Sequence, residues 1–80
     1  MSSFDYIAEA GAIRDALVGD DLSDWRTRIR GAIDTGSTGS EILMAVRWNL
    51  VELLKAEPKL PADVTGRIKD YILAANKLLS

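Results

Sequence analysis

The chain has 80 residues, of which 48% are hydrophobic, and its formal net charge is −2. This length allows one domain with a modest core, and the hydrophobic content excludes a chain that is disordered throughout. The 10 basic and 12 acidic residues do not provide the strongly basic surface that is typical of nucleic-acid binding.

The sequence contains neither cysteine nor histidine, which excludes disulfides, thiolate metal sites and catalytic triads that need histidine. The first residues carry Asp5 and Glu9 but no Lys or Arg, unlike the basic start of a secretory signal. The longest apolar runs, 42–46 and 71–75, are too short to span a membrane. We therefore expect a cytoplasmic protein without a cofactor, a metal or a transmembrane segment.

The first predicted helix covers about residues 4–18. Its apolar positions recur at steps of four, three and four residues, which places them on one face: Tyr6, Ala10, Ile13 and Leu17. Ser3 is the expected N-cap, and Gly19 is the expected stop signal.

The second predicted helix covers about residues 22–33. Its apolar stripe consists of Leu22, Trp25, Ile29 and the pair Ala32/Ile33. Asp21 or Ser23 is expected to cap its start, and acidic Asp24 suits the positive end of the helix dipole.

The third and fourth predicted helices cover about residues 39–55 and 61–79. Thr38 and Glu41 have the spacing of a capping box at the start of the third helix. Pro61 fits the first position of the fourth helix. The apolar stripe of the fourth helix is Val64, Ile68, Tyr71, Ala75 and Leu78. Together the four segments predict an all-α fold, a compact antiparallel four-helix bundle that forms a single domain over residues 1–80.

The segment between the second and third helices contains a short motif that suggests catalysis. Residues 32–38, with Asp34-Thr35-Gly36 at their centre, resemble the active-site segment of retroviral-type proteases. That resemblance implies a catalytic carboxylate at Asp34 on a loop of an all-β domain that dimerises. The neighbouring segments have helical periodicity instead, so we interpret the motif as a helix connection and expect no enzyme.

The same connection has a second possible use. Residues 31–38 match the glycine spacing of a phosphate-binding loop, but Ser37 stands where that motif requires lysine. An anion held by the loop Gly36–Ser40 remains an alternative, because backbone amides at a helix N-terminus attract anions. A loop of small residues that caps the third helix is the simpler interpretation.

The third helix has an unusually wide apolar arc, about twice the width that a surface helix of a small bundle needs. One explanation is that this helix is central, with Arg47 extending its aliphatic stem over apolar neighbours toward water. The other is that the helix carries a second, exposed stripe. Met and Trp are common at interface centres. We predict a protein-interaction surface consisting of Met44, Arg47, Trp48, Val51 and Lys55.

The function expected from this arc is that of a small interaction or regulatory module, which binds another protein or forms a homodimer. A rival function is nucleic-acid binding through Arg26 and Arg30, which share one side of the second helix. Asp24 and Asp34 flank these arginines and favour a solvated, ion-paired face instead.

Overall fold

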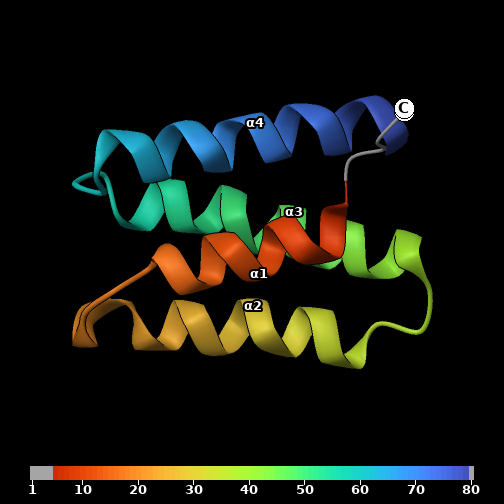
Figure 1. The fold of residues 1–80 in the computed structure, drawn as a ribbon, viewed down its shortest axis with the longest axis horizontal. Coiled ribbons are helices and arrows are strands. Elements are labelled where there is room, and N and C mark those ends of the chain that lie inside the picture. Colours follow the sequence, from red (N-terminus) through yellow and green to blue (C-terminus); the bar gives the residue numbers. More distant parts are fainter. Residues whose placement is uncertain (1–4, 80) are drawn as a thin grey trace.

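A computed structural model describes residues 5–79 and confirms the predicted all-α bundle. The described residues form four α-helices and one short 3₁₀ turn, with no strand among them: α1 (Tyr6–Ala16), η1 (Asp20–Leu22), α2 (Ser23–Thr35), α3 (Gly39–Ala56) and α4 (Ala62–Leu79). Figure 1 shows that successive helices run in opposite directions and that α1 begins at the end of the bundle where α4 ends.

The helices α1 and α3 form the middle of the bundle, and α2 and α4 lie on opposite sides of them (Figure 1). Each of the two outer helices packs against both α1 and α3, and within the described part of the chain α2 and α4 do not touch. The helix α3 therefore has three packing partners, which accounts for part of its wide apolar arc.

The core is one cluster of apolar side chains from all four helices. Its buried members are Ala10, Ile13, Leu17, Ile29, Ala32, Leu43, Val46, Leu50, Leu53, Val64, Ile68, Tyr71 and Ala75. The predicted stripes of the first two helices supply buried or half-buried residues throughout. Leu78 is the exception in α4, because it lies in the last turn at the open end of the bundle and is 59% exposed.

The first helix is shorter than predicted. The predicted cap Ser3 lies outside the described residues, and within them Asp5 caps α1 by accepting a hydrogen bond from the Ala8 amide at 3.0 Å. The helix ends at Ala16, and Leu17 leaves it in an extended conformation with its side chain still in the core. Gly19 then adopts φ of +102°, a conformation that favours glycine.

The start of the second helix differs from the prediction. Neither Asp21 nor Ser23 caps it, because η1 leads directly into α2 and the Ser23 amide bonds to the carbonyl of Asp20. The helix continues to Thr35, two residues beyond the predicted end, where the Thr35 hydroxyl donates to the Gly31 carbonyl at 2.7 Å.

The starts of α3 and α4 follow the predicted signals closely. The Thr38 hydroxyl accepts from the Glu41 amide at 3.2 Å, as expected of a capping box. The Glu41 carboxylate accepts from the Ser37 amide at 3.3 Å, one residue before the position that the motif predicts. Pro61 immediately precedes α4, and its carbonyl accepts the Thr65 amide at 2.9 Å.

Several side-chain contacts join α1 to α4, and we call two of them, the Tyr6–Tyr71 contact and the Glu9–Arg67 contact, the α1–α4 clasp. The rings of Tyr6 and Tyr71 meet edge to face at 5.8 Å between centroids, and the Tyr71 hydroxyl donates to the Tyr6 carbonyl at 3.3 Å. Arg67 binds the Glu9 carboxylate through both Nε at 2.6 Å and Nη2 at 3.1 Å. This bidentate hydrogen bond raises the pKa of Arg67, whereas burial, followed by the nearby Tyr6 and Glu9, raises the pKa of Tyr71.

Candidate interaction surface

The helix α3 presents two large apolar side chains to solvent. Trp48 is 59% exposed and Met44 is 50% exposed, one turn apart on the same side of the helix. They line a shallow groove between α3 and α4, the α3–α4 groove, together with Arg47, Asn76 and Leu79. Three of the five residues predicted for the interaction surface therefore meet in one place.

Arg47 is the half-buried member of the α3–α4 groove. Its guanidinium Nε donates a hydrogen bond to the side-chain oxygen of Asn76, which joins α3 to α4. Arg47 lines the groove together with the apolar side chains of Met44, Trp48 and Leu79. Arg47 thus contributes both packing and a fixed positive charge.

The other two predicted residues lie further along α3, outside the groove lining. Val51 is half-buried, and Lys55 is exposed, with its Nζ 3.4 Å from a Glu52 carboxylate oxygen. Exposed pairs of this kind contribute little to stability, so Lys55 remains available for a stronger partner. The two residues continue the exposed side of α3 toward its C-terminus.

Sequence reasoning missed Asn76 and Leu79, which complete the groove from α4. Leu79 lies four residues after buried Ala75, so the helical period places it beside the core stripe. That spacing was a usable signal. No sequence pattern marks Asn76, because its hydrogen bond to Arg47 depends on which part of α3 lies opposite it.

The arginines of α2 have partners within the molecule. Arg26 donates from Nη1 to the carbonyls of Leu17 at 2.6 Å and Gly19 at 2.8 Å, which fastens the connection between α1 and α2. Arg30 lies 3.7 Å from the carboxylate of Asp34. Both arginines line a polar groove beside α1. The rival function, nucleic-acid binding, would have to use a guanidinium that already fastens a loop.

Asp34 lies in the last turn of α2, with its carboxylate exposed beside Arg30. A protease of the type that the motif resembles needs this carboxylate on a β-loop, and α2 places it on a helix instead. The glycine of the motif has a packing role. A β-carbon on Gly36 would lie 2.3 Å from Cγ1 of Ile42, so the connection passes too close to α3 for any side chain.

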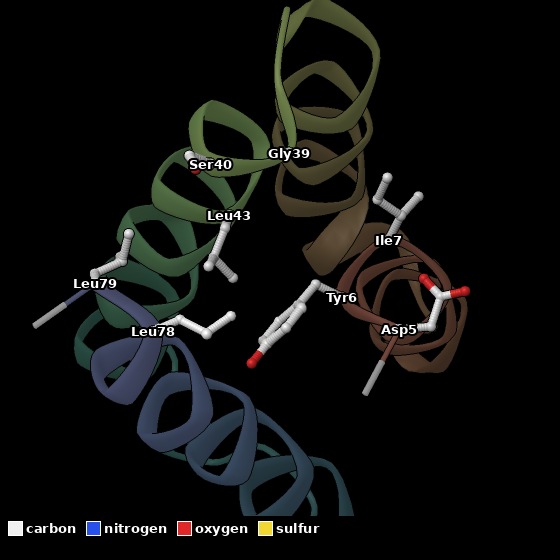
Figure 2. A pocket seen from close by; sticks show the side chains of 8 residues that line it. All are labelled: Asp5, Tyr6, Ile7, Gly39, Ser40, Leu43, Leu78 and Leu79. Atoms are coloured by element: carbon white, nitrogen blue, oxygen red, sulfur yellow. The ribbon is translucent and has the colours of Figure 1, made fainter. Parts of the chain in front are cut away.

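Gly39 and Ser40, at the end of the loop Gly36–Ser40, border a mainly apolar hollow of about 620 Å³. Figure 2 shows the side chains of Tyr6, Leu43 and Leu78 pointing into this hollow, and Asp5 pointing away from it. Two of these three side chains are apolar, and the hydroxyl of Tyr6 donates to the Ala74 carbonyl at 3.5 Å. Anion binding by the loop stays a prediction.

Comparisons with protein families, with curated proteins and with solved structures found no match for this chain. Within residues 5–79, no cluster of acidic side chains has the composition of a metal site. None of the helices there combines the length and apolar character that crossing a bilayer requires. The α3–α4 groove is thus the feature of the described residues on which a function is best argued.

Proposed function

We propose that this chain is a small, non-enzymatic, cytoplasmic interaction module that contacts a protein surface through the exposed side of α3 and the α3–α4 groove. The observation that carries this proposal is the exposure of Trp48 beside Met44 and Leu79. A tryptophan side chain that becomes buried when two proteins bind is among those that most often dominate the binding energy.

The arrangement around Trp48 has the organisation of an interface. Met44 and Leu79 supply apolar contact area, and Met adapts its shape to a partner. Arg47 and Asn76 already bond to each other, so a partner would meet a polar rim that is ordered in advance. An ordered rim lowers the entropy cost of binding.

The test compares two variants that each shorten one exposed apolar side chain. Trp48→Ala removes the centre of the proposed surface, and Val18→Ala removes a side chain that is 75% exposed on the α1–α2 connection. Solution mass and co-purifying proteins are measured for both, with circular dichroism to verify the helical fold. We expect Trp48→Ala to lose a contact that Val18→Ala retains.

If both variants keep the solution mass and the co-purifying proteins of the parent chain, the assignment of this surface is wrong. Because the indole is mostly exposed, its removal should change the free energy of unfolding by less than about 1 kcal/mol. A lost contact therefore reports on binding and not on unfolding.

A further inference from the structure

The exposed side of α3 carries a stripe of five residues with opposite charges at its two ends, and we call it the α3 stripe. Glu41, Met44, Trp48, Val51 and Lys55 follow one another at steps of three, four, three and four residues, so they share one face. All five are exposed or half-buried. The centre of the stripe is apolar, its N-terminal end is acidic and its C-terminal end is basic.

This pattern is self-complementary in one orientation only. Two copies of α3 that pair in parallel would place Glu41 beside Glu41 and Lys55 beside Lys55, which is repulsive. Two copies that pair antiparallel about Trp48 would place each Glu41 beside Lys55 of the second copy, because both lie seven residues from Trp48. We infer that the partner of this surface is a second copy of the chain, bound antiparallel with a two-fold axis near Trp48.

Symmetry doubles each favourable contact of this arrangement. A two-fold interface uses the same patch on both subunits, so one charge pattern supplies two ion pairs, and the two Trp48 side chains meet at the axis. The Glu41 carboxylate accepts one amide hydrogen from Ser37 and retains further acceptor capacity. In the dimer, Lys55 would exchange its ion pair with Glu52 for one with Glu41 of the second copy.

The α3 stripe and the α3–α4 groove together would have to supply the area of a stable interface. A stable interface buries about 800 Å² per subunit, or about 15% of the 5173 Å² surface of this molecule. One helix stripe is too narrow for that area, but the α3–α4 groove flanks it with Asn76 and Leu79. A net charge of −2 per chain adds little repulsion between copies.

The experiment measures the dissociation constant by sedimentation equilibrium at low ionic strength, where exposed ion pairs are least screened. The variants are Glu41→Lys, Lys55→Glu and the double variant. The control is Lys59→Glu, which reverses a charge outside the α3 stripe, on the connection between α3 and α4. Each single variant converts two attractive pairs into two repulsive pairs, so we expect about tenfold weaker dimers. The double variant exchanges the charges and should restore the parent affinity.

The inference rests on the proposed function, and its failure can be distinguished from the failure of that function. If the parent chain is still monomeric at about 10 μM, the self-pairing is wrong. The proposed function still stands in that case if Trp48→Ala loses another protein that Val18→Ala retains. Dimers that both single variants leave unchanged, or that the double variant does not restore, overturn the antiparallel arrangement. A dimer that Trp48→Ala does not weaken overturns the self-pairing, and it overturns the proposed function as well if Trp48→Ala also keeps every co-purifying protein.

Discussion

Gly36 lies where the α2–α3 connection passes against the first turn of α3. A β-carbon at this position would also approach the Ile42 amide nitrogen at 3.1 Å and its Cα at 3.2 Å, so backbone as well as side chain would have to move. We predict that Gly36→Ala lowers the free energy of unfolding by about 1–3 kcal/mol, as overpacking typically does. Urea denaturation measures this change.

Gly31→Ala is the matched control for that substitution. Beyond the backbone of α2 itself, no neighbouring group lies within 4 Å of a β-carbon at Gly31. Alanine should therefore raise the free energy of unfolding by about 0.5–1 kcal/mol through its higher helix propensity. A Gly36→Ala variant that behaves like Gly31→Ala would show that the connection tolerates a side chain.

Tyr71 makes the stability of the bundle depend on alkaline pH. In an unfolded chain a tyrosine titrates near pH 10, and burial raises the pKa of Tyr71 above that value. The folded protein then keeps the phenol proton where the unfolded chain has lost it. The free energy of unfolding should therefore be unaffected by this group below about pH 10 and fall above it, by at most about 1.4 kcal/mol per pH unit.

Tyr71→Phe tests this dependence, because it removes the titrating group and keeps the ring in the core. We expect the variant to be less stable near neutral pH by about 1 kcal/mol, since the bond to the Tyr6 carbonyl is lost. Above pH 10 the difference between variant and parent should shrink or reverse. Parallel alkaline denaturation curves for the two proteins would contradict this assignment.

One side chain of α2 binds two carbonyls of the α1–α2 connection. Arg26 holds the carbonyls of Leu17 and Gly19 through one guanidinium nitrogen. We predict that Arg26→Ala lowers the free energy of unfolding by about 1–2 kcal/mol, because it removes two charge-assisted hydrogen bonds. Thermal denaturation followed by circular dichroism gives the value.

Arg30→Ala, on the same side of α2, is the control for Arg26→Ala. Its guanidinium is exposed and lies 3.7 Å from the Asp34 carboxylate, so its loss should change the free energy of unfolding by less than about 0.5 kcal/mol. Equal effects of the two variants would mean that the α1–α2 connection does not need Arg26.

The ends of the helices show which structural signals in the sequence are local and which depend on the rest of the fold. The start of α3 was predictable because Thr38 and Glu41 bond to amides within four residues of themselves. The end of α1 was not, because Leu17 leaves the helix to place its side chain in a core that three other helices build. The predicted cap of α2 was wrong because η1 leads into the helix and the Ser23 amide bonds to the Asp20 carbonyl, so no side chain caps α2.

At the scale of the whole molecule, self-association links stability to concentration. A dimer that forms through the α3 stripe stabilises the folded state by mass action, so its melting temperature rises with protein concentration. Between about 5 and 500 μM we expect a rise of roughly 5 °C or more for the parent chain. Differential scanning calorimetry at several concentrations measures the shift.

Trp48→Ala should melt at the same temperature over the same concentration range, because it lacks the centre of the proposed contact. Val18→Ala, shortened on the α1–α2 connection, should retain the concentration dependence of the parent chain. A parent melting temperature that does not change with concentration would argue against a dimer of the folded chain.

The candidate surface was only partly predictable from the sequence. The period of α3 placed Met44 and Trp48 away from its core stripe, and both are exposed. The helical period does not tell how much of the apolar arc the neighbouring helices cover. The half-burial of Val51 could therefore not be predicted from the sequence. The contribution of Asn76 depends on how α4 lies along α3, and that follows from packing of the whole bundle.

The α1–α4 clasp has a consequence for the kinetics of folding. Its members are separated by 58 and 65 residues in the chain, whereas successive helices contact one another across short connections. Local contacts generally form first, so the clasp should be largely absent from the transition state. Arg67→Gln should then speed unfolding by about threefold and leave the refolding rate unchanged in stopped-flow measurements. The first and last helices would therefore close the bundle late and release it early.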